Sequence, residues 1–293
     1  MAATDRKVQT PDGRTLLVQE GGDRRGRPVL AHAGTPNSRK LYSRHLAEAE
    51  EQGIRLICYD RPGYGGSTPA PGRTVADCAA DVRIIADALG IEKLGIWGIS
   101  GGGPHALACA ALLPDRVVAV ASLASIAPYG ATGLDYFAGM GDLNVEDIKL
   151  MLADPGAARA KTAADRELLL QATPAGIQEF MQTLLSPVDA AVLTGDYAEH
   201  MAGNLKDGLG PGIEGWWDDG WAHLHPWGFA FEAIRIPVML WQGRQDRFVP
   251  FGHGEWLAKQ IPGVDAHLSE EDGHLTLTQR RLPQIHRWLL EHF

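Results

Sequence analysis

The sequence has little that would suit a nucleic acid, a membrane or a disulfide framework. Its 36 acidic residues outnumber 27 Lys and Arg, a net charge of −9, so phosphate backbones and anionic headgroups are poor partners. It contains no apolar run of the roughly 18 residues that a transmembrane helix needs, and Met1–Lys7 lacks the apolar segment of a secretory signal. Its three cysteines, Cys58, Cys78 and Cys109, lie in apolar stretches without C-x-x-C spacing. We therefore expect free thiols, a cytoplasmic protein and a small-molecule substrate as the partner.

Motifs for cofactors are missing as well. There is no H-E-x-x-H pair, and the glycine-rich stretches are followed by neither a P-loop lysine nor a ribose-binding acid at the right distance. No cysteine lies on a glycine-rich turn that would make it a nucleophile. The sequence therefore implies no metal and no organic cofactor.

The acidic residues are concentrated in one region. From Asp135 to Asp219 there are 15 Asp and Glu against 5 Lys and Arg. A solvated outer surface is the plainer interpretation. The alternative is weak steering of neutral or cationic substrates, which salt would screen beyond roughly 8 Å.

Short apolar strands alternate with helical patterns up to about residue 125, which is typical of a mostly parallel sheet flanked by helices. The predicted strands here are Arg14–Glu20 (antiparallel), Pro28–Ala33, Ile54–Tyr59, Lys93–Ile99 and Val117–Leu123, with helices over Thr74–Leu89 and Pro104–Leu113. After residue 234 the rhythm resumes, with strands Ile236–Gln242 and Val264–Leu268, helix Gly254–Gln260 and a last helix ending at Leu290.

Between residues 128 and 233 the strand pattern stops. Helical patterns at Val145–Leu152, Ala164–Gln171 and Ile177–Leu185 precede a stretch rich in Gly, Pro and Trp. Because the sheet pattern continues afterwards, we expect an insertion over the carboxyl edge of the sheet. The predicted organisation is an α/β core of residues 1–127 and 234–293 with a helical cap of residues 128–233.

The segment Gly98-Ile99-Ser100-Gly101-Gly102 matches G-x-S-x-G. A five-residue match can arise by chance, and a simple strand-to-helix turn would also use such glycines. Here the match ends an apolar strand and opens a helix, which is the required context of a nucleophile elbow. We predict that Ser100 is the nucleophile.

A serine hydroxyl needs a base, and the base needs a carboxylate. His274 follows the last predicted strand, and Asp246 follows the strand before it, so that both lie at the same edge of the sheet. The order Ser, Asp, His is the one that this arrangement uses. Asp272 is a rival acid, but it lies too close to His274 in sequence to face the ring comfortably. The other histidines are interpreted as packing, cap or hydrogen-bonding residues: His105, His223, His225, His267 and His286.

Two backbone amides should bind the oxyanion. One belongs to Gly101, directly after the nucleophile. The other is predicted at Thr35, in the loop Ala33-Gly34-Thr35-Pro36 that follows the strand Pro28–Ala33; a plain strand-ending turn is the alternative interpretation of this loop.

Together these segments resemble the α/β-hydrolase superfamily over essentially the whole chain. The resemblance is strongest to bacterial members, including esterases and proline iminopeptidases, that carry H-G-T-P, D-R-P-G-Y-G-x-S, G-x-S-G-G-G-P-H-A-L-A and G-x-x-D-x-x-V-P. The matching stretches are Ala33–Pro36, Asp60–Ser67, Gly98–Ala108 and Gly243–Pro250. The first departs from the pattern, because the usual histidine is an alanine here and His32 lies one place earlier. Whether His32 braces the loop in its place is open.

These observations predict a serine hydrolase that cleaves a small or medium uncharged ester. Apolar cap side chains suit either a pocket or helix packing: Met140, Leu150, Met151, Phe180, Met181 and Leu184. Four tryptophans between Trp216 and Trp227 either pin the cap or line the pocket. The alternatives are a lyase or cyclase, a ligand receptor, a proline iminopeptidase, and perhydrolysis as a side reaction. Ser100 excludes haloalkane dehalogenases and epoxide hydrolases, which need Asp at the elbow.

Overall fold

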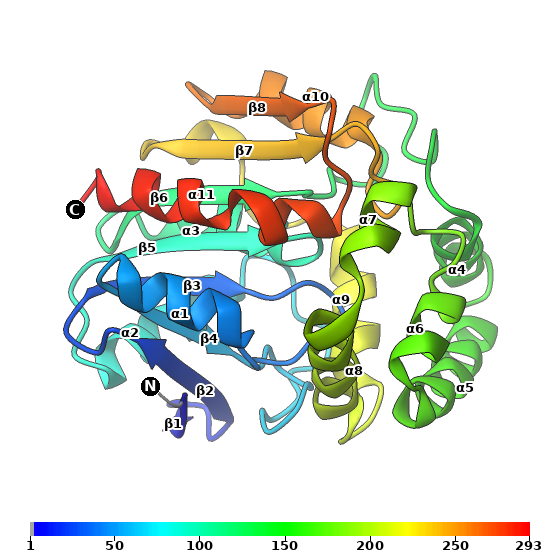
Figure 1. Cartoon of the computed structure of the whole chain (residues 1–293), viewed down its shortest axis with the longest axis horizontal. Coiled ribbons are helices and arrows are strands. Elements are labelled where there is room, and N and C mark those ends of the chain that lie inside the picture. The colour runs from blue at the N-terminus through cyan, green and yellow to red at the C-terminus, as the bar shows by residue number, and fades with distance from the viewer. Residues whose placement is uncertain (1–2) are drawn as a thin grey trace.

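An eight-stranded sheet lies at the centre of the protein in a computed structural model that describes residues 3–293 (Figure 1). The strand order is β1-β2-β4-β3-β5-β6-β7-β8; β1 and β2 run antiparallel to their neighbours and the other pairs are parallel. The strands are β1 (Thr4–Gln9), β2 (Thr15–Gly22), β3 (Arg27–His32), β4 (Ile54–Tyr59), β5 (Leu94–Ile99), β6 (Val117–Leu123), β7 (Val238–Gly243) and β8 (Asp265–Ser269). The predicted mostly parallel α/β architecture is confirmed.

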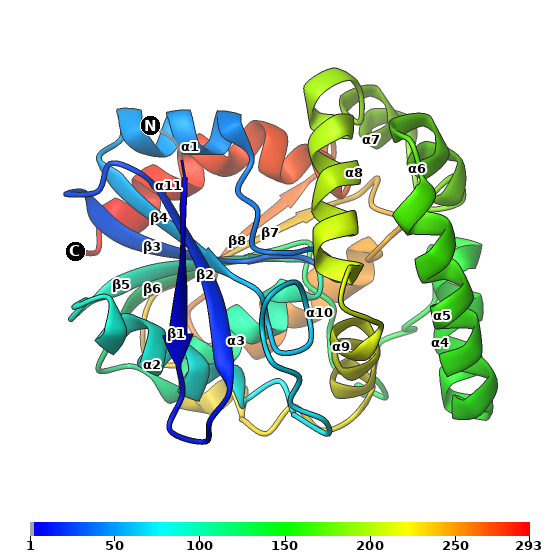
Figure 2. The same ribbon diagram turned by 90° about the horizontal axis from the view of Figure 1, so that it is seen from below.

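Helices cover both faces of the sheet. Helices α1 (Ser43–Glu51) and α11 (Leu282–Leu290) lie on one face, whereas α2 (Cys78–Ala88), α3 (Gly102–Leu112) and α10 (Phe251–Gln260) lie on the other (Figure 2). Each face carries its own apolar core. The central parallel strands are largely apolar, as in β7, where every residue is buried, because these strands are covered on both sides.

The chain between β6 and β7 is helical and gathers at one end of the sheet (Figure 2). Its helices are α4 (Asp142–Ala153), α5 (Pro155–Gln171), α6 (Pro174–Phe180), α7 (Pro187–Val192), α8 (Gly195–Leu209), α9 (Glu214–Leu224) and η1 (Phe231–Ala233). A further short helix, η2 (Leu277–Arg281), lies between β8 and α11. Helices α5, α6 and α7 each begin with proline, which is preorganised for the first helical position. We call α4–α9 the cap; the predicted domain boundaries at 128 and 233 stay a prediction.

Most predicted elements occur with ends shifted by a few residues. The sequence patterns did not predict β1, α1 or the helices α7–α9, the last of which fall in the Gly, Pro and Trp-rich stretch. Within residues 3–293, no helix combines the length and apolar character that crossing a membrane requires. The three cysteines are buried and unbridged.

Candidate active site

Ser100 lies on a strained turn between β5 and α3. Its φ of 56° is left-handed, which is uncommon for a residue with a side chain. The flanking glycines allow this turn: a Cβ at Gly98 would lie 3.0 Å from that of Ala106 and even closer to the Gly102 carbonyl. The geometry is that of a nucleophile elbow, which lifts a serine hydroxyl above the end of the sheet.

His274 and Asp246 lie together in the loops after β8 and β7. The His274 Nδ1–H donates to Asp246 Oδ2 at 2.8 Å, which leaves Nε2 as a proton acceptor. The carboxylate is fixed in turn, because its Oδ1 accepts the amides of Phe248 at 2.8 Å and Val249 at 2.9 Å. Burial of the ring lowers the pKa of His274, but the charge of Asp246 and its hydrogen bond outweigh burial and hold the pKa above its usual 6.5.

The rival acid has a different partner. The Asp272 carboxylate accepts hydrogen bonds from Ser269 Oγ at 2.7 Å and Arg281 Nε at 2.8 Å. It holds the loop after β8 to η2, whereas Asp246 faces the imidazole.

The candidate nucleophile and base share a cavity. Ser100 and His274 both line it, and Phe248 stacks on the imidazole with ring centroids 4.5 Å apart. Among the described residues no direct hydrogen bond joins the Ser100 hydroxyl to the ring. Catalytic hydrogen bonds often tighten only when substrate is bound.

The predicted oxyanion residues also meet. A side chain at Gly101 would collide with Thr35, whose Oγ1 is the closest atom to that position, and with the ring of His223. Within residues 3–293 no backbone hydrogen bond uses the amide of either residue. Both N–H groups are therefore available beside Ser100.

A buried carboxylate of the cap, missed by the sequence analysis, supports this loop. Asp219 of α9 accepts a 2.6 Å hydrogen bond from Thr35 Oγ1 and a 2.9 Å one from Tyr64, and it pairs with Arg61 and Arg73. Burial alone would raise the pKa of Asp219, but the two guanidinium groups hold it well below its usual value. Asp219 is therefore an ionised anchor between the cap and the loop that carries Thr35.

Two histidines whose rings contact each other both donate to the Gly101 carbonyl. His105 of α3 donates from Nδ1 to the Gly101 carbonyl at 2.8 Å, as its predicted hydrogen-bonding role allowed, and His223 of α9 donates from Nε2 at 3.1 Å. Burial lowers the pKa of His223 to about 4, so the ring is neutral near pH 7. The sequence placed His223 in the cap, but its contact with Gly101 could not be predicted because α9 was not.

His32 makes no hydrogen bond to the loop of Ala33–Pro36 among the described residues. Its ring turns toward Cys109, with Nε2 at 3.7 Å from the sulfur, and burial lowers the pKa of His32 to about 3. Arg61 replaces it, because its Nη1 donates to the Ala33 carbonyl and its Nη2 to Thr35 Oγ1.

A second cap carboxylate holds the histidine loop. Asp189 of α7 is fully buried and accepts the backbone amides of His274 at 2.9 Å, Leu275 at 2.7 Å and Thr276 at 3.2 Å. Ser186 Oγ donates to the same carboxylate at 2.9 Å. The peptide that carries the candidate base is thus fixed by the cap.

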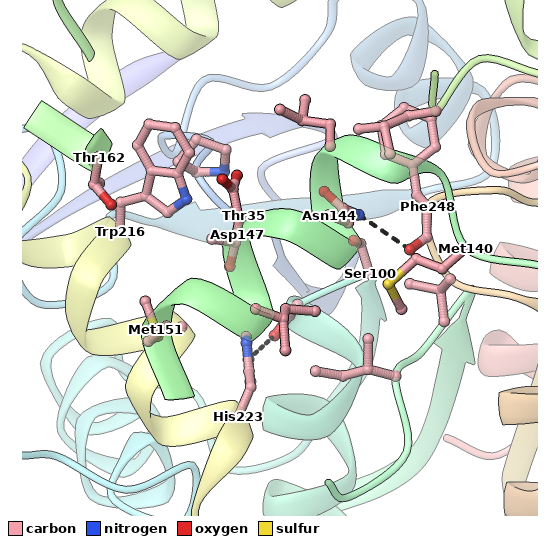
Figure 3. Close-up of a pocket in the computed structure, with 18 of the residues that line it drawn as sticks. Thr35, Ser100, Met140, Asn144, Asp147, Met151, Thr162, Trp216, His223 and Phe248 are labelled. Carbon is pink, nitrogen blue, oxygen red and sulfur yellow. Dashed lines mark hydrogen bonds between the residues drawn. The ribbon is translucent and has the colours of Figure 1, made fainter. Parts of the chain in front are cut away.

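Two cavities meet at Ser100, with volumes of about 210 Å³ and 140 Å³. The larger is mainly apolar and lies between the cap and the sheet (Figure 3). All six apolar cap residues singled out in the sequence line it: Met140, Leu150, Met151, Phe180, Met181 and Leu184. Trp216 also lines this cavity, whereas Trp227 packs in the core. The tryptophans of this stretch therefore serve both predicted purposes, lining the pocket and packing against the core.

Comparison with known proteins gives matches over most of the chain. A family model described as alpha/beta hydrolase fold matches residues 27–280. A 2-hydroxy-6-oxononadienedioate/2-hydroxy-6-oxononatrienedioate hydrolase of Klebsiella pneumoniae is 26% identical, with 93% of this chain and 90% of the relative covered. A non-heme chloroperoxidase of Streptomyces lividans is 29% identical, but the match spans only 58% of each chain. The structure of an esterase from Rhodococcus, 19% identical, superimposes with a TM-score of 0.72 over 99% of both chains, a likeness of fold alone.

Proposed function

The chain belongs to the α/β-hydrolase fold family, and from this premise we propose that it is a serine hydrolase that cleaves a small or medium, uncharged carboxylic ester. The observation that carries the proposal is the hydrogen bond from His274 to Asp246 at the wall of the cavity that also contains Ser100. It leaves the Nε2 of His274 ready to accept the proton of a nucleophile.

The chemistry is a two-step acyl transfer. The Ser100 oxygen attacks the ester carbonyl while His274 takes the hydroxyl proton, and the amides of Thr35 and Gly101 bind the oxyanion. His274 then protonates the leaving alcohol, activates water and releases the acid. A base contributes about 10²–10⁴-fold and a single oxyanion donor about 10²–10³-fold.

The two cavities have different places in this reaction. Only the smaller one contains His274, which must reach the leaving oxygen, so we assign it to the alcohol. The larger apolar cavity then takes the acyl group. Its volume of about 210 Å³ is below the usual range of ligand pockets, which starts near 300 Å³, and supports an acyl group of modest size.

The charges around the cavities support an uncharged substrate. The lysines that line them are paired: Lys161 with Asp147 at 2.7 Å and Asp165 at 2.6 Å, and Lys40 with Asp207 at 3.1 Å. The named substrate of the Klebsiella relative is a dioate, with two carboxylates. No lysine or arginine among the lining residues is left to pair with such a group, so we favour a neutral ester.

Hydrolysis of a nitrophenyl ester series and labelling by a fluorophosphonate test the proposal. Ser100→Ala should abolish both, because the attacking oxygen is gone. Ser125→Ala, at a buried serine after β6 that lines neither cavity, is the control and should keep both. Full turnover in Ser100→Ala would refute the proposal. Labelling without turnover of any ester would favour a receptor or a lyase. Cleavage of a prolyl amide faster than of an ester would favour a proline iminopeptidase.

A further inference from the structure

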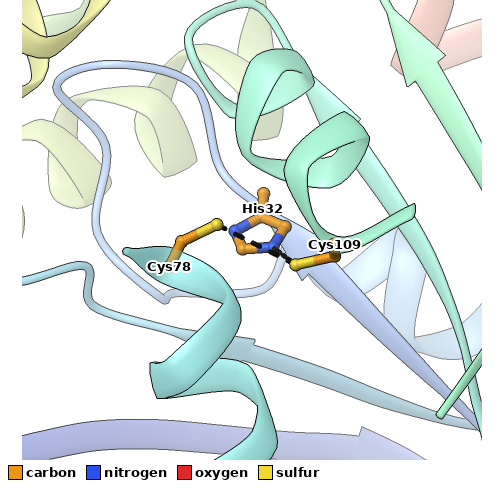
Figure 4. Close-up of side chains that lie close together, drawn as sticks. All are labelled: His32, Cys78 and Cys109. Atoms are coloured by element: carbon orange, nitrogen blue, oxygen red, sulfur yellow. Dashed lines mark hydrogen bonds between the residues drawn. The ribbon is translucent and has the colours of Figure 1, made fainter. Parts of the chain in front are cut away.

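Three side chains that commonly ligate metals lie together outside the cavities around Ser100. His32 ends β3, Cys78 begins α2 and Cys109 lies within α3, so the cluster joins a strand to two helices. All three are buried. Their ligand atoms lie within 4.8 Å of one another (Figure 4).

Two of the three separations between the ligand atoms are close to those of tetrahedral coordination, and the third is within 4.8 Å. The sulfur atoms of Cys78 and Cys109 are 3.9 Å apart, and the Cys109 sulfur is 3.7 Å from Nε2 of His32. Zinc bonds of about 2.3 Å to sulfur and 2.0 Å to nitrogen, at tetrahedral angles, separate two sulfurs by about 3.8 Å and a sulfur from a nitrogen by about 3.5 Å. An ion could therefore enter with shifts of only a few tenths of an ångström along these two edges.

The surroundings leave room for a fourth ligand. Cys78 also lines a separate cavity of about 490 Å³, whose walls include the exposed residues Pro71 and Asp77. A water molecule could complete the coordination from this side. The Nδ1 atom of His32 is buried without a hydrogen-bond partner among the described residues, so the only hydrogen bond that orients the ring is the one to Cys109.

We propose that His32, Cys78 and Cys109 form a structural site for one thiophilic ion of the zinc class. Two thiolates and an imidazole favour such ions over magnesium or calcium, which prefer oxygen ligands. Zn²⁺ with two thiolates and a neutral imidazole has no net charge, which suits a buried position. None of the three residues lines the cavities around Ser100, so the role is separate from ester cleavage.

The competing state is a cluster of protonated thiols. Cys78 lies 3.3 Å from the His105 carbonyl and can donate to it, and Cys109 can share a proton with His32. Metal binding replaces both thiol protons, so a spectroscopic signal from metal-bound thiolate separates the two states.

Cobalt(II), a coloured substitute for zinc, is the probe. Cobalt(II) is added to the folded, full-length protein in the presence of a phosphine reductant. In a parallel sample it is present during refolding, so that a barrier to entry into the folded protein cannot prevent binding. The wild type should bind one cobalt per chain with a thiolate-to-cobalt ultraviolet band and visible bands of tetrahedral geometry, and zinc should bleach them. Cys78→Ser and Cys109→Ser should lose the ultraviolet band. The control Cys58→Ser should keep it, because Cys58 lies outside the cluster.

Thermal melting provides a second measurement. Zinc should raise the melting temperature of the wild type and of Cys58→Ser, because a ligand of the native state stabilises it, but not that of Cys109→Ser. The proposal is overturned if the wild type shows no thiolate band by either route. It is also overturned if Cys58→Ser abolishes the band as completely as Cys78→Ser does.

Discussion

Replacing Asp189 with a neutral residue should slow catalysis, although Asp189 itself does not touch the substrate. In Asp189→Asn one oxygen can still accept the amides of Leu275 and Thr276, but an NH₂ group then faces the His274 amide, which loses its acceptor. An unsatisfied buried donor costs roughly 1–3 kcal/mol of folding stability. Misplacing a catalytic group by about 1 Å can cost about 100-fold. We expect kcat to fall roughly ten- to hundredfold, with KM changed far less.

The pH profile separates this role from simple destabilisation. The negative charge of Asp189 is one of the causes that raise the pKa of His274. Activity needs the neutral ring, so the acid limb of kcat/KM follows that pKa, and removing the charge should shift the limb to lower pH. Asp196→Asn, an exposed acid of the same cap, is the matched control and should change neither quantity. A profile and kcat in Asp189→Asn equal to those of the wild type would refute the reasoning.

Three further predictions concern the pH limb, the cap anchor and the acyl cavity. In the wild type, kcat/KM should fall as pH drops through a value above 6.5, because protonated His274 cannot accept a proton; a limb well below 6.5 would contradict the Asp246 pairing. Asp219→Asn should lower the free energy of unfolding by about 3–5 kcal/mol, measured in urea, because Arg61 and Arg73 lose a buried counter-charge. Met151→Ala should widen the larger cavity and shift the preferred nitrophenyl ester to a longer acyl chain, and an unchanged preference would place the acyl group elsewhere.

The sheet and the candidate residues that follow its strands could be predicted because they depend on local pattern. The G-x-S-x-G glycines are needed where a strand and a helix nearly touch, as the collision of any Cβ at Gly98 shows. Parallel strands bring their carboxyl ends to one edge, so the loops holding Asp246 and His274 had to be neighbours. Their direct hydrogen bond fits that expectation.

The supporting residues could not be predicted, because their roles depend on contacts across more than 80 residues. Asp189 and Asp219 belong to the acidic stretch that was interpreted as a solvated surface, yet both are fully buried. Composition cannot tell a solvated carboxylate from one that meets two guanidinium groups or three backbone amides. Prediction of α7 and α9 would have helped, since Asp189 and Asp219 lie on these helices.

These two carboxylates tie the cap to the two loops of the candidate active site. Asp219 holds the candidate oxyanion loop at Thr35, and Asp189 holds the peptide of His274. Lifting α7 and α9 as a rigid lid would strip the counter-charge from Arg61 and the acceptor from three amides at once. Such a movement would break the ion pairs of Asp219 and the three amide hydrogen bonds of Asp189 in one step, so it is disfavoured. Substrate entry should therefore use movements of the other cap helices, with α7 and α9 remaining in place.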